Sequence, residues 1–242
     1  MIISLSNVLT GVVPAINVGA NAGQVDANIT DPDFSAVYVS SGAVLELSFG
    51  VTNFAKYIAI AGHNLAGGTV EILDGVTLLK TVNLTRNNTV MITDQNASYT
   101  DLTIRLTAVG GDPALVSFIA AGTLINVPNN GEQAGYSRNW LNRPLKQKTS
   151  VNSLASPTAI VNKRVPLAGR LSIPNASTAF SQGQLQEFYD FIETQPFFIK
   201  EIDTNDISSY VCFNPKWIAP KAHGGTRALD VVSFSFRVSN GL

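Results

Sequence analysis

The sequence predicts a mainly β protein, with an N-terminal β-sandwich and a C-terminal β-sheet or half-barrel with one flanking α-helix. Three observations carry this prediction. Short strand-like alternations separated by turn residues fill residues 35–125, and an irregular Lys- and Arg-rich stretch follows over residues 126–164. A single helical pattern then lies among strand patterns in residues 165–242.

The first region has the pattern of several short strands and lacks a helical period. In VLELSF (residues 44–49) and LTIRLT (residues 102–107) apolar and polar side chains alternate, as in strands with one buried face. The run from Tyr57 to Ala61 is apolar throughout, as expected for a strand covered on both faces. The Asp74-Gly75 step is typical of a tight hairpin turn. Together these features indicate a sandwich, which we place at residues 1–127.

The middle region, residues 128–164, is rich in Asn, Ser, Pro and basic residues. A compact domain rarely keeps so long an irregular segment without a use for it. We therefore predict a linker followed by a basic extended arm or hairpin. We expect this arm to contact a neighbouring subunit through Arg138, Trp140, Arg143, Lys146, Lys148, Lys163 and Arg164.

The third region, residues 165–242, predicts a strand, a helix and three further strands. Ser181 and Gln184 match the capping-box spacing S-x-x-Q, so we expect the helix to cover about residues 181–195. The closing run DVVSFSFRV (residues 230–238) alternates apolar and polar side chains. This order predicts a small sheet with one helix packed on it.

Charge is sparse and unevenly distributed along the chain. Only 14% of the residues are charged and the net charge is −1, against roughly 25% charged residues in an ordinary domain. Such a surface suits a protein that is largely covered by neighbours. Residues 1–127 carry four basic and nine acidic side chains, whereas residues 128–242 carry twelve and eight. This asymmetry is compatible with head-to-tail contacts between copies.

Several partner classes lack support in the sequence. The basic stretch holds one aromatic residue, Trp140, and no recognised nucleic-acid motif, so we expect no specific nucleic-acid binding. No run of 18 apolar residues exists, so we expect no membrane insertion. The single cysteine, Cys212, excludes an intrachain disulfide framework, and we expect a buried, inert thiol.

His63 and Asn64 follow the buried strand and precede a Gly-Gly turn in YIAIAGHNLAGG. Their side chains suit the free backbone groups at a strand end, so we favour a structural corner over a ligand-facing or a catalytic role. The other histidine, His223, lies far along the chain, and neither has metal-ligand spacing to a second donor. Asp31 and Asp33 favour a solvated loop, with a calcium site left open. We expect no metal, no cofactor and no enzymatic activity.

Two sets of segments resemble parts of bacteriophage tails. The pattern YIAIAGHNL…GTVEILDG resembles the galactose-binding-like jelly-roll modules of phage tail proteins. RVPLAGRLSI, QGQLQEFYDFIET, PFFIKEID and LDVVSFSFRV resemble the tail-tube and distal-tail (hub) proteins of long-tailed phages. The resemblance implies that the sandwich is jelly-roll-like and that the C-terminal unit is a ring-forming, tail-tube-like β-sheet or split barrel with a flanking helix. It also implies an arm that reaches an adjacent subunit or ring. The order departs from many distal tail proteins, since here the jelly-roll module comes first.

From this resemblance we expect a structural protein of the virion, made in the host cytoplasm and placed at the phage tail tip. We expect copies to form a six-fold ring between the tail-tube protein and the distal baseplate or receptor-binding proteins. The alternative is a carbohydrate-binding module for host-surface glycans, with Tyr38, Phe54, Tyr57 and Tyr99 as candidate stacking residues. A hydrolase finds little support, because no nucleophile–base pair stands out in the sequence.

Overall fold

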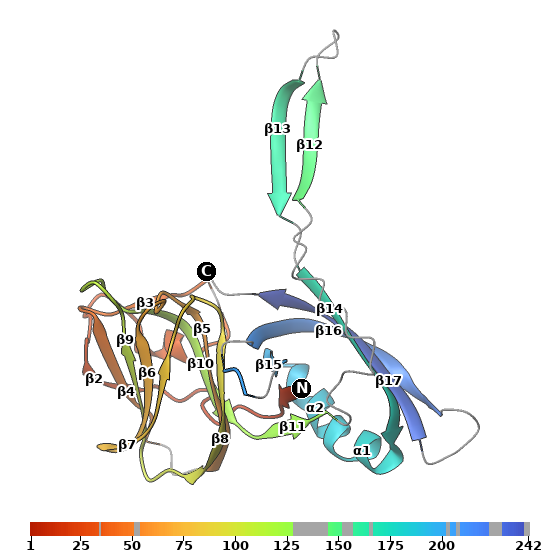
Figure 1. The fold of residues 1–242 in the computed structure, drawn as a ribbon, viewed down its shortest axis with the longest axis horizontal. Coiled ribbons are helices and arrows are strands. Elements are labelled where there is room, and N and C mark those ends of the chain that lie inside the picture. The colour runs from red at the N-terminus through yellow and green to blue at the C-terminus, as the bar shows by residue number, and fades with distance from the viewer. Residues whose placement is uncertain are drawn as a thin grey trace.

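The computed structural model describes residues 1–33, 35–50, 54–127, 145–151, 157–164, 167–201, 204–206, 209–222 and 229–239. The chain forms a sandwich and a second sheet unit side by side, with a two-stranded hairpin projecting from the second unit (Figure 1). The fold is mainly β, with antiparallel sheets and a short helical segment, so the predicted fold class is confirmed.

The sandwich consists of two antiparallel sheets. One has the order β2-β4-β9-β6-β7, with β2 at Ala15–Val18, β4 at Val44–Ser48, β9 at Leu102–Thr107, β6 at Thr69–Asp74 and β7 at Thr77–Asn83. The other has the order β3-β10-β5-β8, with β3 at Tyr38–Val39, β10 at Leu115–Gly122, β5 at Phe54–His63 and β8 at Val90–Ser98. A short 3₁₀ helix, η1 (Asp26–Ile29), packs beside β10.

The alternation that predicts the sandwich also fills its core. In β4, Leu45 and Leu47 are fully buried between the sheets, while Glu46 between them points to the outer face. In β5, the continuous apolar run is buried on both sides: Ile58 and Ile60 face the other sheet, and Tyr57 faces the second unit. A central strand with two covered faces explains the unbroken apolar sequence.

The second unit is built on one six-stranded antiparallel sheet. Its order is β11-β1-β15-β16-β17-β14, with β11 at Leu124–Asn126, β1 at Ile2–Ser4, β15 at Phe197–Lys200, β16 at Ser209–Ala222, β17 at Leu229–Ser239 and β14 at Leu167–Ser177. The helices α1 (Thr178–Gln182) and α2 (Gln184–Ile192) cover one face of this sheet. Phe188 of α2 meets Phe197 edge-to-face, with 5.3 Å between the ring centroids.

One backbone position in this sheet needs glycine for space. Gly169 of β14 lies opposite Phe236 of β17, and a Cβ atom there would collide with the phenyl ring. The ring thereby packs over the strand backbone and reaches Phe197, with 5.6 Å between centroids.

The chain enters and leaves the sandwich through the second unit's sheet. β1 pairs with both β11 and β15, so residues 2–4 and 124–126 belong to that sheet. The domain boundary that the sequence predicts at residue 127 assigns both segments to the sandwich. These pairings join residues more than a hundred positions apart, and no local pattern reports such pairing.

The helix begins earlier than the capping-box pattern predicts. Ser177 is the N-cap, and its hydroxyl oxygen accepts a hydrogen bond from the N–H of Phe180 at 3.1 Å. Ser181 is buried inside α1, and Gln184 opens α2 after a break at Gly183. The expected start at Ser181 is therefore wrong by one helical turn, because β14 runs directly into the helix at Ser177.

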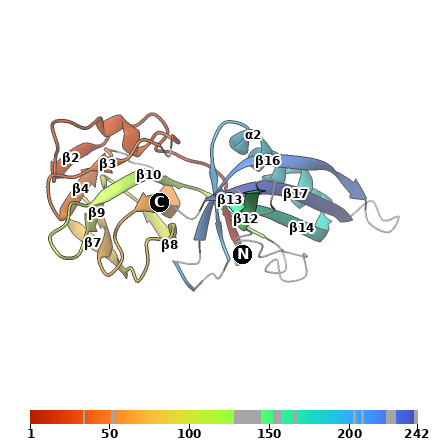
Figure 2. The same ribbon diagram turned by 90° about the horizontal axis from the view of Figure 1, so that it is seen from above.

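The two units share a core where they meet (Figure 2). Tyr57 and Phe118 of the sandwich pack against Phe198 of β15, and the rings of Phe118 and Phe198 stack with centroids 5.9 Å apart. The two segments that connect the units, one after β1 and one before β11, also bind each other, since the Leu5 N–H donates to Thr123 O at 2.8 Å. A shared apolar core and a double crossing fix the sandwich on the sheet.

Candidate functional site

The projecting hairpin is the most unusual feature of the surface. β12 (Leu145–Val151) and β13 (Pro157–Arg164) pair with each other and, within the described residues, join no other sheet. Figure 1 shows both strands standing away from the rest of the molecule. A two-stranded hairpin alone in water is marginally stable at best. Within the described residues, the hairpin therefore has no sheet of its own chain to lean on.

The hairpin gathers part of the predicted basic arm. Its register places Lys146 opposite Lys163 and Leu145 opposite Arg164. With Lys148, the two strands carry four basic residues and no acidic residue. Arg138, Trp140 and Arg143 lie outside the described residues.

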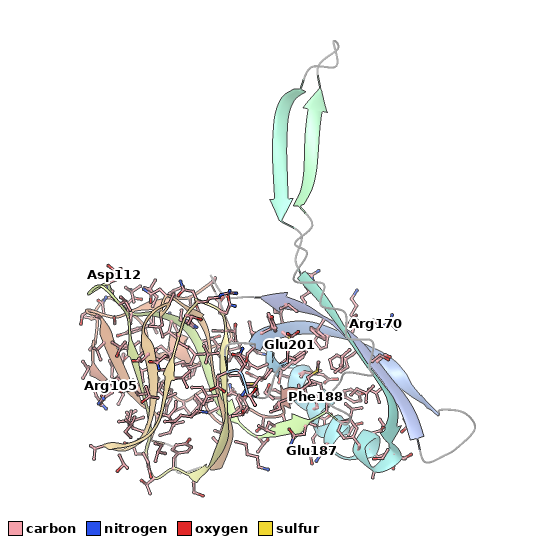
Figure 3. The ribbon with its side chains drawn as sticks, in the orientation of Figure 1. Arg105, Asp112, Arg170, Glu187, Phe188 and Glu201 are labelled. Atoms are coloured by element: carbon pink, nitrogen blue, oxygen red, sulfur yellow. The ribbon has the colours of Figure 1, made fainter. Side chains whose placement is uncertain are left out.

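A second open feature is the edge of the six-stranded sheet. β14 pairs only with β17 among the described strands, so the eleven-residue strand presents one free backbone edge. Arg170, labelled on this strand in Figure 3, is exposed. Unpaired N–H and C=O groups along an edge are a template for pairing with another chain.

The His63–Asn64 pair ties three loops of the sandwich together. The Leu65 N–H donates to Nδ1 of His63 at 3.3 Å, so the ring is protonated at Nε2, which donates to Asn88 O at 2.7 Å. Asn64 donates to Pro113 O and accepts from the Leu115 N–H, both at 2.9 Å. Every polar atom of the imidazole is thus occupied by backbone.

The environment of His63 favours its neutral form. The side chain is fully buried, and this desolvation lowers the pKa of His63 below its ordinary value, although the bond to Asn88 O works in the opposite direction. A neutral imidazole whose two nitrogens both hold backbone groups has no free lone pair for a metal or for a proton-transfer step.

A buried lysine at the junction of the two units is a feature that sequence reasoning missed. Lys200 of β15 is 1% exposed, and its Nζ donates to Oδ1 of Asp206 at 2.7 Å and to Oγ1 of Thr93 at 2.5 Å. Lys80 of β7 lies 3.4 Å from the other oxygen of Asp206. The carboxylate therefore joins β15 to β7, and the Lys200 ammonium joins β15 to Thr93 of β8. The signal in the sequence was weak: a lone lysine at the end of an apolar strand.

The outer face of the sandwich carries a second polar cluster. Arg105 of β9 donates to Glu46 of β4 at 2.7 Å and to Glu71 of β6 at 2.9 Å, across three neighbouring strands (Figure 3). Such partly exposed ion pairs contribute little stability, and all three groups already have partners. The cluster therefore leaves little for a ligand to bind.

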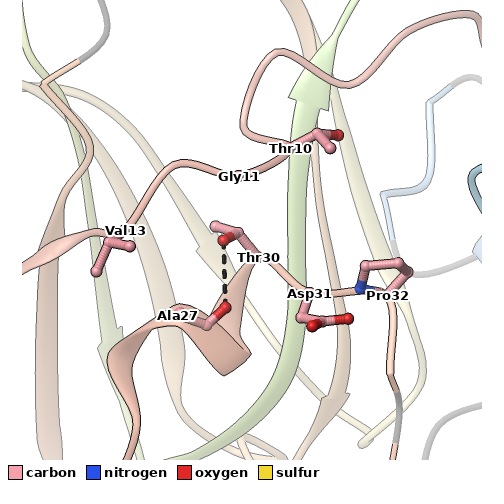
Figure 4. A pocket seen from close by; sticks show the side chains of 7 residues that line it. All are labelled: Thr10, Gly11, Val13, Ala27, Thr30, Asp31 and Pro32. Carbon is pink, nitrogen blue, oxygen red and sulfur yellow. Dashed lines mark hydrogen bonds between the residues drawn. The ribbon is translucent and has the colours of Figure 1, made fainter.

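A shallow hollow lies where the segments that lead into β2 and β3 meet (Figure 4). Val13, Ala27 and Pro32 contribute apolar surface, and Thr10 and Asp31 stand at its rim. The Thr30 hydroxyl donates to Val12 O at 2.6 Å and so holds the two segments together. The hollow has a volume of about 240 Å³, below the roughly 300–1,000 Å³ of small-molecule sites.

A larger, more open depression borders the end of α2. It has a volume of about 650 Å³ and is lined by Glu193, Thr194, Gln195, Phe213 and Pro215 among others. It is an exposed shelf between the helix end and β16.

The aromatic residues proposed for glycan stacking are largely internal. Tyr38 and Tyr57 are fully buried and Tyr99 is 2% exposed, while the side chain of Phe54 lies outside the described set. The Tyr38 hydroxyl accepts from the Asn21 N–H at 3.0 Å, and that of Tyr57 donates to Ser6 O at 2.6 Å. These three rings therefore serve the core.

Within the described residues, no three His, Cys, Asp or Glu side chains converge on a point that could hold a metal ion. Asp31 and Asp33 accept hydrogen bonds from the loop that follows them, such as Asp33 N–H to Asp31 Oδ1 at 3.0 Å. Cys212 is buried, and burial raises the pKa of its thiol well above the ordinary value. No helix of the described chain is long and apolar enough to span a membrane.

Comparison with known proteins gives structural neighbours only. No protein-family model and no curated protein matches the chain. Among solved structures, chitosan-binding module 1 of a chitosanase/glucanase from Paenibacillus sp. IK-5 aligns with a TM-score of 0.39 and 10% identity, over 48% of this chain and 98% of the module. A selenomethionine-labelled mutant of the same module aligns with a TM-score of 0.38 and 11% identity, over 48% of this chain and 97% of the module.

Proposed function

We propose that the chain is a structural subunit of a bacteriophage tail tip, where copies form a ring that connects the tail tube to the distal parts. The observation that carries this proposal is the β12–β13 hairpin, which stands away from its own subunit and pairs with no other described strand. A free-standing hairpin suits an arm that lies on a neighbouring copy.

The free edge of β14 supplies the second element of such an assembly. In a closed ring, each copy offers one edge of its sheet to the next, and a contact of this head-to-tail kind satisfies the edge's backbone groups. At the opposite edge, β11 is three residues long. A short strand there leaves room for a neighbour's longer strand to continue the sheet.

The charges of the hairpin and the sandwich support a contact between the hairpin of one copy and the sandwich of another. The hairpin strands carry four basic residues, and residues 1–127 carry nine acidic side chains against four basic ones. Asp31, Asp33 and Asp112 are among the exposed acids of the sandwich. Opposite charges on separate units favour contact between copies over contact within one copy, because the hairpin points away from its own sandwich.

Electron microscopy of the purified protein at high concentration tests the proposal. We expect rings with a central opening, of six-fold or three-fold symmetry. The matched variant replaces residues 138–164 with a short Gly/Ser linker of sufficient reach. Because the hairpin strands pair only with each other in the described structure, this variant should fold normally and lose the rings.

Two results would count against the ring. The intact chain could remain monomeric even when purified tail-tube protein is added as a template. Alternatively, the hairpin-deleted variant could form the same rings as the intact chain, and then the arm would have no part in assembly.

Glycan binding by the sandwich is the second candidate function. The feature that favours it is the hollow beside Asp31, where the exposed Thr10 and a carboxylate border apolar surface. Neighbouring solved structures include a chitosan-binding module, and chitosan oligosaccharides are therefore the first ligands to titrate. Loss of binding in Asp31→Asn, with binding kept in Asp112→Asn, would support this function. Absence of binding to a broad glycan panel would exclude it for this surface.

A further inference from the structure

The six-stranded sheet has one face that the helices do not cover. Leu171 of β14 and Phe234 of β17 belong to the core beneath α1 and α2. Since neighbouring residues of a strand point to opposite faces, Arg170 and Ser235 lie on the other face. The sandwich covers that face at β1 and β15, where Phe198 joins the shared core. We call the rest of it, on β14, β17 and the second half of β16, the open sheet face.

The open sheet face carries three exposed cations. Arg170 of β14 and Lys216 of β16 lie opposite Ser235 of β17 from either side, and Arg237 lies two residues further along β17. β14 and β16 contain no acidic residue, and the single acid of β17, Asp230, alternates onto the helix-covered face. Within the described residues, these cations therefore have no counter-charge on their own face.

The outer side of α2 carries the opposite charge. The buried residues of this helix face the sheet, whereas Glu187, Asp190 and Glu193 are exposed and recur every third residue. The sequence between Arg170 and Lys200 contains no basic residue. None of the three carboxylates forms an ion pair with a described residue. We call these three residues the acidic stripe.

The cations and the stripe lie on opposite sides of the second unit and have similar lengths. Figure 3 labels Arg170 on the upper side of the sheet and Glu187 below the helices. Two interstrand spacings separate Arg170 from Lys216, which is about 10 Å. Six helical positions separate Glu187 from Glu193, which is about 9 Å. The two surfaces are therefore complementary in both charge and spacing.

The hairpin indicates that a second copy occupies the open sheet face. Figure 1 shows β12 and β13 rising on the side of the sheet that is opposite to α1 and α2. The two strands carry Lys146, Lys148, Lys163 and Arg164 and no acidic residue. A copy seated on the open sheet face lies on the side toward which the hairpin projects. The hairpin and the face can thus contact the same neighbour.

We propose that the acidic stripe of one copy docks on the open sheet face of another copy. Because the two surfaces lie on opposite sides of one unit, the contact is heterologous and repeats from copy to copy. Pairing at the β14 edge extends a ring sideways, whereas this contact crosses the sheet and stacks one ring on the next. Exposed ion pairs are individually weak, so whole rings, which engage several contacts at once, associate more strongly than single copies. The inference rests on the proposed ring and adds a contact between rings.

Two charge-reversal variants test this contact. The stripe variant combines Glu187→Lys with Asp190→Lys, and the face variant combines Arg170→Glu with Arg237→Glu, all at exposed positions. In sedimentation equilibrium at about 0.05 M salt, each variant alone should self-associate about tenfold or more weakly than the parent, because like charges then face each other. Mixed together, the two variants should associate again. The unaltered stripe of the face variant fits the unaltered face of the stripe variant.

A control variant separates the contact from the effect of net charge. Lys56→Glu with Arg86→Glu changes the net charge as the face variant does, at exposed positions of the sandwich. This control should associate as the parent does, and circular dichroism verifies that all variants are folded. Equal weakening in the control and the face variant overturns the contact. Equal association of the parent at about 0.05 M and about 0.5 M salt also overturns it, because salt screens exposed charges.

The outcomes distinguish this contact from the ring itself. If the face variant loses association and the stripe variant keeps it, the open sheet face binds another acidic surface and the docking of α2 is overturned. If the contact is overturned while single rings form in microscopy, the proposed function stands without it. Charge-dependent association that yields stacks or filaments without rings supports the contact and counts against the ring.

Discussion

Lys200 and Asp206 form a buried ion pair, 2.7 Å between Nζ and Oδ1, at the seam between the sandwich and the six-stranded sheet. The two partners differ in surroundings: the lysine is 1% exposed, whereas the Asp206 side chain is 18% exposed and has a second cation, Lys80, at 3.4 Å. Asp206 O also accepts the Met91 N–H at 2.9 Å, so the same loop is bound to β8 by backbone. Among the described residues, Asp206 is the one carboxylate paired with this buried ammonium.

This asymmetry predicts that removing one partner lowers the stability of the fold more than removing the other. Asp206→Asn should destabilise the protein by about 3–5 kcal/mol, because it leaves the Lys200 ammonium buried without a counter-charge. Lys200→Met should cost less, since Asp206 keeps Lys80 and partial contact with water. Chemical denaturation of both variants at neutral pH measures the difference. A larger loss for Lys200→Met would contradict this account of the seam.

His63 predicts a pH-dependent stability. Its pKa in the folded protein is lowered by burial, whereas in the unfolded chain it takes its ordinary value of 6.5. Below that value the unfolded chain binds a proton that the folded chain does not, so stability is fully present above pH 6.5 and declines as the pH falls toward the folded pKa. Urea denaturation at a series of pH values between neutral and acidic should show this decline.

The matched variant is His63→Ala. It should lose about 1–3 kcal/mol at neutral pH, because Asn88 O and the Leu65 N–H lose their partner. It should also show a smaller decline in stability below pH 6.5 than the parent chain. An unchanged pH profile in this variant would mean that other groups cause the decline.

Local patterns in the sequence predicted the features that depend on neighbours in the chain. Alternation in residues 44–49 and 102–107 placed β4 and β9, because strand periodicity needs only one buried face. Pairing between distant segments could not be predicted in this way. The pairing of β1 with β15, for example, places Ile2 opposite Lys200, close to two hundred positions away in the sequence. The partner of Lys200 could not be predicted either, because no pattern in the sequence indicates that the Asp206 carboxylate lies against the Lys200 ammonium.

The helix start shows how a correct rule can select the wrong residue. The segment ASTAFSQGQ contains two serines, and only Ser181 has Gln three positions later. The choice is decided by β14, which pairs with β17 up to Ser177 and leaves no residues for a linker before the helix. Tertiary pairing thus overrides the local signal.

The two serines predict a simple contrast in stability. Ser177→Ala should cost about 1 kcal/mol, because it removes the side-chain acceptor for the Phe180 N–H at the helix start. Ser181→Ala should be near neutral, since the buried Ser181 hydroxyl has no hydrogen-bond partner within the described residues. Thermal or urea denaturation of the two variants gives the comparison. Equal losses would place the helix start elsewhere.

Gly169 and Phe236 predict a steric coupling across β14 and β17. Gly169→Ala should destabilise the second unit by about 1–3 kcal/mol, because the new methyl group meets the phenyl ring where the two strands pair. Phe236→Leu should cost about 1 kcal/mol by itself through lost packing against Phe197. Since the smaller leucine vacates the space above residue 169, the double variant should be more stable than the sum of the two single losses implies. Strict additivity in this cycle would show that the loss in Gly169→Ala arises from the backbone, and that the ring does not require glycine opposite it.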